Sequence, residues 1–274
     1  MQIKVKFFSK RLVKKYLELL SIISLIFSFV FIVIDIPDDF KIPVGLLFLV
    51  FLLSLYFITW IRSNLLCEAK LNIDNSTVVV KTGDIFKEDE LKVIAFNEYF
   101  DTQVDNKIIS EKTLNGIYLN EQVENVNELD DFISNDIHLK DRILKTNDYR
   151  SCGKKIKYKL GTIFQHNDYL LTAFTKFDND NRAYLNMNDY INFLLNFWNE
   201  IDIIYNGRSV SIPLLGSGIT RLKESNTISE QELLELLIWS FKISRIKFTY
   251  PSKVSIIIHE SKKDKINFYK LKEC

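Results

Sequence analysis

The sequence predicts a transmembrane helical hairpin followed by an α/β domain with a mixed or parallel sheet. Two apolar segments of membrane-spanning length lie near the N-terminus, at residues 16–34 and 42–61. The remaining residues, 63–274, alternate short apolar runs with amphipathic runs, which is typical of a sheet with helices on both faces. We therefore predict two parts: a basic N-terminus with two spans over residues 1–62, and an α/β domain over residues 63–274.

Both apolar segments have the length of a membrane span. Residues 16–34 hold a single charge, Glu18, and residues 42–61 hold none. As helices they would each extend about 28–30 Å, the thickness of a bilayer's hydrocarbon core. A hairpin buried in a soluble core is the alternative. A cleaved signal peptide is disfavoured, because the run is too long and no small-residue cleavage site follows it.

The distribution of cations predicts the orientation. Residues 1–15 contain Lys and Arg but no acid, whereas the connection at residues 35–41 contains three acids and one Lys. The positive-inside rule then places both termini in the cytoplasm. No ionisable residue lies near the middle of either span, which disfavours a transporter or a proton relay.

Three serines, Ser21, Ser24 and Ser28, have the spacing of one helix face. Small residues on one face allow membrane helices to approach closely, so this face is a candidate seam for self-association. Ordinary tolerance of serine in a membrane helix explains the pattern equally well.

The charge and the cysteines exclude several classes of protein. The chain has a formal charge of +1, and residues 63–274 carry about −3 of net charge, so we predict no nucleic-acid partner. Three widely spaced cysteines and three histidines, with no CxxC pair, indicate neither a disulfide framework nor a metal site.

The cytoplasmic part contains a series of predicted elements. A hairpin is predicted at residues 67–73 and 77–81, and a mobile loop at residues 178–182. Ser229 and Glu232 form a capping box that should begin a helix. Further strands are predicted at residues 91–96, 169–175, 209–215, 254–259 and 266–271, and helices at residues 126–133, 139–144, 190–198 and 230–243.

The strongest local motif is Gly216-Ser217-Gly218, directly after an apolar strand. Glycines permit positive φ and close approach, so successive amides can form a nest for a phosphate. An ordinary tight turn is the competing interpretation. The motif is neither the dinucleotide fingerprint nor a Walker loop.

Two further polar positions follow predicted strands. Asp84 stands in Gly-Asp-Ile after the hairpin, and Asn97 ends the strand at residues 91–96. Ligands of open α/β sheets bind outside the carboxyl ends of the strands, where such side chains would meet. Each residue also suits a plain turn.

In order, these motifs resemble the macro domain, the α/β module that binds ADP-ribose. With "FNEYFDT", "LGT" at residues 160–162 and "IPLLGSG" behind two spans, the chain is similar to the membrane-anchored macro-domain effectors of bacterial Thoeris anti-phage defence. The resemblance implies a three-layer α/β/α fold and a multi-pass location in the bacterial inner membrane.

The resemblance also implies a ligand site. Asp84 would accept from the adenine amino group and Ile85 would donate to the ring, while the glycine loop would hold the diphosphate. Glu98 and Asp101 would accept from ribose hydroxyls or from a cationic group, or else be exposed to solvent. The residues predicted to bind ligand are Asp84, Ile85, Asn97, Phe100, Asp101, Thr102, Leu215, Gly216, Ser217, Gly218 and Ile219.

The function implied is that of a sensor. A TIR-domain partner would make an ADP-ribose-type signal, histidine joined to ADP-ribose, and its binding would drive homo-oligomerisation, membrane disruption and abortive cell death. The loop after Asn97 lacks the glycine run of hydrolytic macro domains, so we predict neither catalysis nor a cofactor or metal. A membrane-tethered ADP-ribosyl hydrolase and a non-sensing tether are the alternatives.

Overall fold

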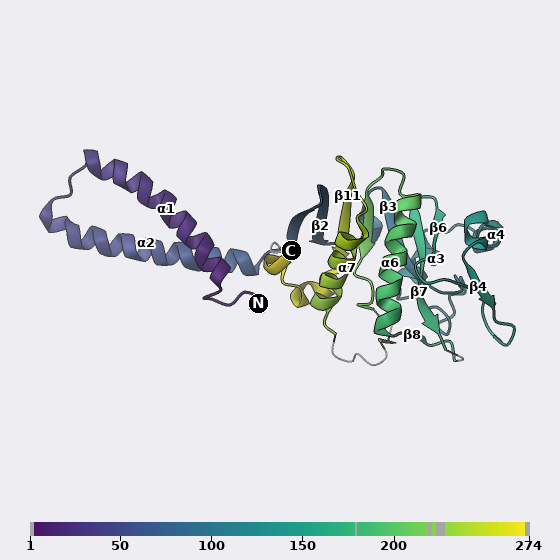
Figure 1. Ribbon diagram of the computed structural model, residues 1–274. Coiled ribbons are helices and arrows are strands. Elements are labelled where there is room, and N and C mark those ends of the chain that lie inside the picture. Colours follow the sequence, from purple (N-terminus) through teal and green to yellow (C-terminus); the bar gives the residue numbers. More distant parts are fainter. Residues whose placement is uncertain (1–2, 179, 219–220, 223–227, 272–274) are drawn as a thin grey trace. The chain divides into compact units, whose positions relative to one another are not determined.

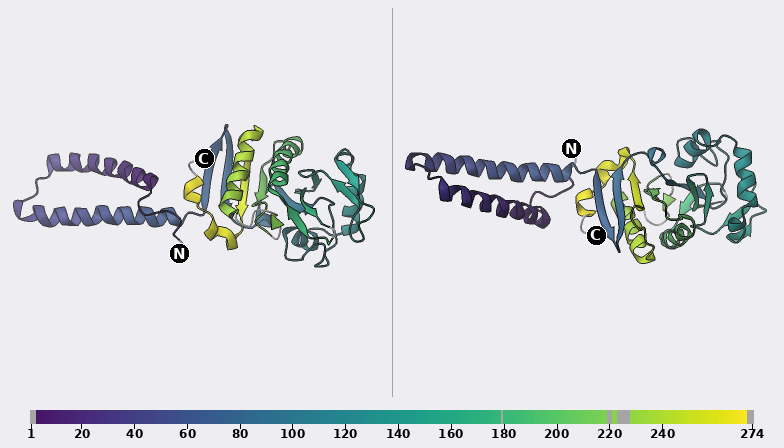
Figure 2. Two further views of the ribbon diagram at one scale, coloured as in Figure 1. Left: turned by 60° about the horizontal axis from the view of Figure 1, so that its bottom comes forward. Right: turned by 90° about the horizontal axis from the view of Figure 1, so that it is seen from above.

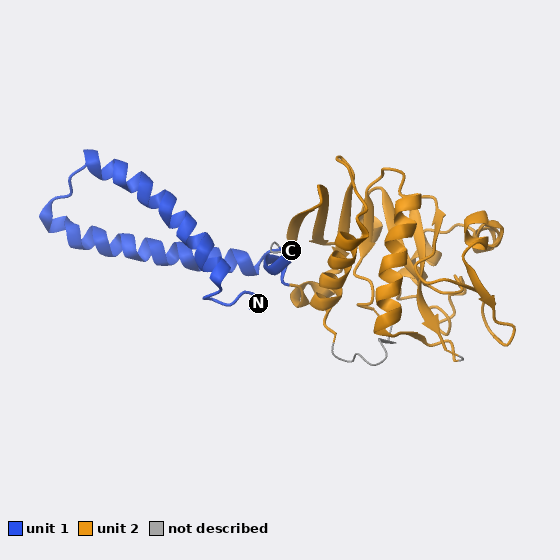
Figure 3. Cartoon of the chain, viewed as in Figure 1, with its two compact units in different colours: residues 1–67, 267–273 blue, residues 68–266, 274 orange. Residues whose placement is uncertain are grey.

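The computed structural model describes residues 3–178, 180–218, 221–222 and 228–271. The chain divides into two compact units (Figure 3). The helical unit comprises residues 1–67 and 267–273, and the α/β unit comprises residues 68–266 and 274. Each unit is described separately.

The helical unit contains two long helices, α1 (Lys10–Val33) and α2 (Asp38–Asn64). The Ser9 side chain caps α1 by accepting from the Leu12 amide, and Asp38 and Asp39 lie in the first turn of α2, where the helix dipole favours acids. Helix α1 begins before the predicted span at residues 16–34, and α2 extends beyond the predicted span at residues 42–61 at both ends, because the flanking residues continue the helical backbone.

Both helices are long and apolar enough to cross a membrane. Their most apolar 18-residue windows have mean hydropathies of 2.4 and 2.5, and no residue of either window is buried. Side chains such as Phe29 and Ile32 are 66% and 78% exposed. Surfaces of this size and polarity mark an interaction site or a membrane segment.

The last described element is a short helix, α8 (Phe268–Leu271), in the helical unit. We predicted a strand at residues 266–271, and that prediction is wrong. Asn267 explains the helix, because its side-chain oxygen accepts from the Lys270 amide at 3.1 Å and so caps the turn.

The α/β unit is built on a nine-stranded mixed sheet (Figures 1 and 2). Its order is β1-β2-β11-β9-β3-β7-β8-β10, with β6 paired to β7. Strands β2, β11, β9, β3 and β7 are parallel neighbours, while β1, β6 and β8 pair antiparallel. The strands are β1 (Glu68–Ile73), β2 (Ser76–Thr82), β3 (Leu91–Asn97), β6 (Ile163–His166), β7 (Tyr169–Phe177), β8 (Ala183–Leu185), β9 (Val210–Pro213), β10 (Arg221–Leu222) and β11 (Lys253–Ile258).

Helices cover both faces of this sheet. On one face α6 (Met187–Ile204) packs beside α7 (Glu230–Ser244), and Phe174 of β7 contacts Phe193 of α6 with ring centroids 4.8 Å apart (Figures 1 and 2). The other face buries Phe96 and Leu171 against α3 (Leu114–Glu121), α4 (Val126–Asn135) and α5 (Ile137–Lys140). The predicted three-layer α/β/α fold with a mixed sheet is therefore confirmed.

Most predicted elements of this unit are present. The capping box at Ser229 and Glu232 begins α7. The predicted helix at residues 139–144 is wrong beyond its first turn: α5 ends at Lys140, and the chain enters β4 (Ile143–Thr146), which pairs with β5 (Ile156–Tyr158). Pairing of β4 with β5 gives hydrogen-bond partners to the backbone N–H and C=O groups of both strands. A helix of only four residues would leave most of its backbone groups without such partners. Of the loop predicted at 178–182, residue 179 lies outside the described residues.

Candidate functional site

The predicted site residues that the structure describes lie at one end of the sheet, where the strands pass into loops. Because β2, β11, β9, β3 and β7 are parallel, their carboxyl ends share an edge. The loops after β2 and β9 contain Asp84 and Gly216–Gly218 respectively, and Asn97 ends β3 directly before the loop that contains residues 98–102. Strands β9 and β3 are neighbours; the chain passes from β3 to β7 on one side, and from β9 through β10 and α7 to β11 on the other side. Such a switch point is where open α/β sheets form a ligand crevice.

The loop after β2 is fixed by backbone bonds and by Asp84. The Gly83 amide donates to the carbonyl of Ile258, which ends β11, at 3.0 Å. The Asp84 side chain accepts from the Phe86 amide at 3.1 Å and caps the 3₁₀ turn η1 (Ile85–Lys87). Asp84 is exposed and Ile85 is buried. The carboxylate of Asp84 therefore has a structural role as a cap and keeps a free face toward solvent.

The loop after β9 is a tight turn with an open end. Leu214 accepts from both the amide and the hydroxyl of Ser217, at 3.3 and 2.8 Å. Gly216 has φ +88°, a conformation that glycine adopts without strain. A Cβ at Gly218 would meet nothing within 4 Å. Gly218 is thus an exposed backbone position that a ligand can approach, while Ile219 lies outside the described residues.

Helix α6 supports this loop from below. Tyr190 is fully buried and its hydroxyl donates to the Leu215 carbonyl at 3.1 Å. Burial raises the pKa of Tyr190, so it remains a neutral donor. Leu215 itself is 2% exposed. Leu215 therefore anchors the loop through its backbone and its buried side chain.

The loop after β3 is internally bonded. The Asn97 side chain accepts from the amides of Tyr99 and Asp101, at 3.0 and 3.3 Å, and donates to the Asp101 carboxylate at 3.0 Å. Phe100 is buried with φ 51°, which is unusual for a bulky residue and indicates local backbone strain. The loop is consequently held in one conformation by its own side chains.

Asp101 is buried and paired with Arg150. The carboxylate accepts from the two terminal guanidinium nitrogens at 3.0 and 2.6 Å and from the Lys154 amide at 2.7 Å. The guanidinium lies 4.0 Å from the Tyr99 ring centroid and also donates to Asn181. The alternative of solvent exposure for Asp101 is wrong, because Arg150 provides the partner that burial of a charge requires.

Glu98 is buried in the same way. Its carboxylate pairs with Lys157 at 2.9 Å and accepts from the Phe177 amide at 3.2 Å. Burial raises the pKa of Glu98, and the bonds to Lys157 and Phe177 oppose that rise. Solvent exposure is wrong for Glu98 as well.

Thr102 and Lys154 complete this network through Asp130 of α4. The Thr102 hydroxyl donates to the Asp130 carboxylate at 2.7 Å, and the Lys154 ammonium pairs with Asp130 at 2.5 Å and donates to the Phe100 carbonyl at 2.7 Å. Burial lowers the pKa of Lys154, and the bond to Asp130 opposes that shift. Thr102 therefore fastens the loop to α4.

Sequence reasoning did not predict the cations of this network, Arg150, Lys154 and Lys157. They lie in the β4–β5 segment, which has no apolar periodicity, and the only available signal was a run of cations that could neutralise Glu98 and Asp101. The "LGT" motif has a packing role, because a Cβ on Gly161 would lie 2.6 Å from Asn196 of α6.

The structure therefore brings three loops to one edge but gives their residues different roles. Asp84 and Gly218 are exposed. The predicted residues at the end of β3 and in the loop after it are buried, namely Asn97, Phe100, Asp101 and Thr102. Among the described residues, no group of His, Cys, Asp and Glu is arranged to hold a metal ion. The exposed surface offers a carboxylate acceptor at one loop and the backbone of Gly218 at another.

This fold and this edge are those of a macro domain. A family model described as "Thoeris protein ThsA, Macro domain" matches residues 78–259, and the chain belongs to this family. The Thoeris protein ThsA of Bacillus amyloliquefaciens (strain Y2) is 45% identical over 226 residues, which cover 81% of this chain and 75% of that protein.

Solved structures of macrodomains are also similar to this chain. An Oceanobacillus iheyensis macrodomain with ADP is 12% identical with a TM-score of 0.46, and the match covers 75% of this chain and 94% of that one. A mutant of the Oceanobacillus iheyensis macrodomain with ADPR is 13% identical with a TM-score of 0.45, and the match covers 75% of this chain and 96% of that one.

Proposed function

We propose that the chain is an anti-phage defence effector whose α/β unit binds an ADP-ribose-derived signal. The observation that carries this proposal is that an exposed carboxylate, Asp84, and an exposed glycine, Gly218, lie on loops at the same end of the sheet. A carboxylate can accept from an adenine amino group, and backbone amides suit a diphosphate. Membership of the Thoeris ThsA macro-domain family supports the same ligand class.

The signal in this proposal is histidine joined to ADP-ribose, made from NAD by a TIR-domain partner. Adenine would lie at Asp84 and Ile85, and the diphosphate would lie over the turn at Gly216–Gly218. The buried loop after β3 would form the wall beside β9 through its backbone, because its carboxylates are already paired with Arg150 and Lys157. The chain would recognise the product of its partner and make no contact with the partner itself.

A sensor is favoured over a hydrolase by the state of Asn97. Its side-chain oxygen accepts from two amides and its nitrogen donates to Asp101, so the amide is occupied within the loop. A hydrolase needs a side chain within reach of the bond to be broken or of the attacking water. The tether alternative would require no small-molecule binding at all.

The helical unit would anchor the chain in the bacterial inner membrane with both termini in the cytoplasm. The two apolar helices and the basic residues before α1 support this arrangement. Ligand binding would then promote self-association of the hairpins, membrane disruption and death of the infected cell.

Calorimetry of the detergent-solubilised full chain with ADP-ribose and with its histidine conjugate tests the proposal. We expect saturable binding of the conjugate, and chromatography of the same samples should recover it intact. Recovery of cleaved products would support the hydrolase, and absence of heat with both compounds would support the tether.

A further inference from the structure

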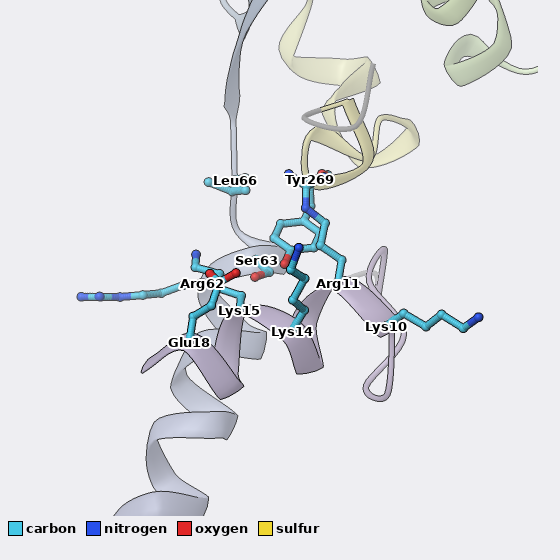
Figure 4. A pocket seen from close by; sticks show the side chains of 9 residues that line it. All are labelled: Lys10, Arg11, Lys14, Lys15, Glu18, Arg62, Ser63, Leu66 and Tyr269. Atoms are coloured by element: carbon cyan, nitrogen blue, oxygen red, sulfur yellow. The ribbon is translucent and has the colours of Figure 1, made fainter. Parts of the chain in front are cut away.

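The helical unit contains a basic cavity of about 900 Å³ (Figure 4). It forms where α1 begins, α2 ends and α8 packs. One acid, Glu18, lines it. The cations that line it are Lys10, Arg11, Lys14, Lys15 and Arg62. The excess of positive charge makes this cavity suitable for an anion.

Most of these cations form no ion pair with a carboxylate of another described residue. Among the described residues, the ion pairs include none of Lys10, Lys14, Lys15 and Arg62. In Figure 4, Lys10 and Arg62 extend away from the other labelled side chains on opposite sides, whereas Lys14 and Lys15 lie between them. Lys14 and Lys15 therefore remain at the cavity with their charge available, and Lys10 and Arg62 add positive charge from either side.

Arg11 is fixed in place at the wall of the cavity. Its guanidinium donates to the Tyr269 carbonyl at 2.8 Å and lies 4.8 Å from the centre of the Tyr269 ring. Tyr269 is 6% exposed, so this wall is a packed surface. The cavity thus has a defined side formed by α8, which a random group of surface lysines would not have.

The position of the cations opposes the usual preference of a helix. The N-terminus of a helix carries partial positive charge, which disfavours cations and favours anions. The first turn of α1 contains no acid, and its first six residues include Lys10, Arg11, Lys14 and Lys15. A bound anion would be stabilised by the side chains and by the helix dipole together.

Aromatic residues locate the cavity along the hairpin. Tyr16 contacts Tyr56 with ring centroids 4.9 Å apart, and Phe7 contacts Tyr56 and Trp60 at 5.0 and 5.3 Å. Aromatic side chains collect at the membrane–water interface. The exposed apolar surface of α1 starts about one turn after Lys14, at Leu17, which is 55% exposed.

We propose that this cavity binds the phosphate group of an anionic phospholipid from the cytoplasmic leaflet. The inference rests on the proposed membrane anchoring. Basic pockets at the cytoplasmic ends of membrane helices suit anionic headgroups. The exposed apolar sides of α1 and α2 continue from the cavity, so acyl chains have a surface to follow. That continuity favours a lipid over a free phosphate ion.

Native mass spectrometry of the full chain in detergent tests the proposal with phosphatidylglycerol and phosphatidylcholine as probes. We expect preferential retention of phosphatidylglycerol. The triple variant Lys14→Gln, Lys15→Gln and Arg62→Gln should bind it about ten- to a hundred-fold more weakly, since each cation near a lipid surface contributes on the order of a few-fold. Equal retention of the two lipids by the wild type would overturn the proposal.

A matched control removes three exposed lysines of the α/β unit, through Lys145→Gln, Lys155→Gln and Lys159→Gln. This variant should keep the wild-type preference. An equal loss in both triple variants would show a general charge effect and would also overturn the proposal. Inorganic phosphate should not displace the lipid. If inorganic phosphate at equal concentration does displace the lipid, the cavity is assigned to a soluble phosphate instead.

Two measurements separate this inference from the proposed function. The cavity variant should bind the ADP-ribose conjugate with unchanged affinity, which also shows that it is folded. Carbonate extraction of cell membranes reports whether the wild type is an integral protein. An extractable protein refutes the anchor and the lipid site together, whereas a resistant protein without lipid preference refutes only the lipid site.

Discussion

Gly216 and Gly218 are two residues apart and have different requirements. Gly216 adopts φ +88° and a Cβ there would contact Leu233 and Tyr190 at ordinary distances of 3.5 and 3.6 Å. Gly218 has no positive φ and an added Cβ would enter open space. The fold therefore requires glycine at the first position, and only an approaching ligand would require it at the second.

We predict that Gly218→Val abolishes binding of the ADP-ribose conjugate without lowering stability. The branched side chain would occupy the space above the turn, where the diphosphate would lie. Calorimetry measures the first effect and urea unfolding the second. Gly216→Ala is the contrasting variant, expected to cost about 1–2 kcal/mol of stability because its φ is left-handed. Unchanged affinity in a folded Gly218→Val protein would remove the ligand from this turn.

The cap formed by Asp84 permits a second variant that separates stability from recognition. Asp84→Ser keeps an oxygen that can accept from the Phe86 amide, but shortens the reach toward a base. We predict unchanged thermal stability and a ten- to hundred-fold weaker affinity, since a lost acceptor is typically worth about 1–3 kcal/mol. If Asp84→Ser binds like the wild type, Asp84 is only a cap.

At the level of residues, the sequence predicted well which loops lie at the same end of the sheet. It predicted the roles of their side chains less well. Apolar strands ending in Asp84, Asn97 and Gly216 are local patterns, and parallel pairing brings their ends together. The partner of Asp101 lies 49 residues away, in a segment with no regular periodicity. Because burial with a distant cation leaves no local signature, the sequence left solvent exposure of Asp101 open as an alternative, and that alternative is wrong.

The elements around the first loop depend on the buried pair of Asp101 and Arg150. Arg150→Met would leave Asp101 buried without its paired cation, and breaking one side of such a pair costs about 3–5 kcal/mol. We predict a loss of that size in urea unfolding, together with weaker ligand binding as the loop after β3 loosens. Adding Asp101→Asn should restore part of the stability, because an amide needs no counter-charge.

An exposed pair offers the control for that variant. Arg182 and Asp180 lie 3.6 Å apart with side chains 65% and 68% exposed. Solvent screening makes such pairs weak, so Arg182→Met should change stability little. Equal effects of the two substitutions would show that burial of the Asp101–Arg150 pair has no energetic importance.

Helix α7 is joined to the 3₁₀ turn η2 (Glu260–Lys265) through Glu230. Burial alone would raise the pKa of Glu230, but hydrogen bonds from Lys265 and Lys262 outweigh it and lower the pKa to about 2. A depressed carboxyl pKa stabilises the fold above its unfolded value of 4.5, and this contribution is lost as the pH falls toward 2.

We therefore predict that the wild type loses stability more steeply than Glu230→Gln between pH 4.5 and pH 2. Urea unfolding of both proteins across this range measures the difference. Parallel pH profiles would show that the two lysines do not hold Glu230 ionised.

At the level of elements, long periodic or capped segments were predictable and short ones were not. The capping box fixed the start of α7, and apolar runs located β3, β7 and β11. Helix α3 was missed because Gly116 interrupts its helical pattern in the sequence. The structure requires glycine at this position, since a Cβ there would lie 2.2 Å from the Ser110 carbonyl oxygen. Helix α8 was predicted as a strand, because four residues are too few to distinguish the two periods.

For the whole molecule, the serine face of α1 is available for self-association. Ser21 and Ser28 are exposed, and their hydroxyls donate to the Leu17 and Ser24 carbonyls of the same helix. Within the hairpin, α1 instead contacts α2 through Phe27, whose ring lies 4.8 Å from that of Phe48. The serines thus satisfy their own polar groups and leave a surface of small residues to a second copy.

A ligand can drive assembly only if it binds the assembled state more tightly than the unassembled one. We predict that the histidine conjugate of ADP-ribose raises the mass of the detergent-solubilised full chain in analytical ultracentrifugation. Replacing Ser21, Ser24 and Ser28 together with Leu should reduce this increase and the toxicity in cells, because larger side chains separate the helices, while calorimetric affinity stays unchanged. Leu46→Ala and Leu47→Ala on exposed positions of α2 serve as the control and should assemble normally. An identical mass with and without ligand in the wild type would refute ligand-induced assembly, and full assembly of the leucine variant would place the seam elsewhere.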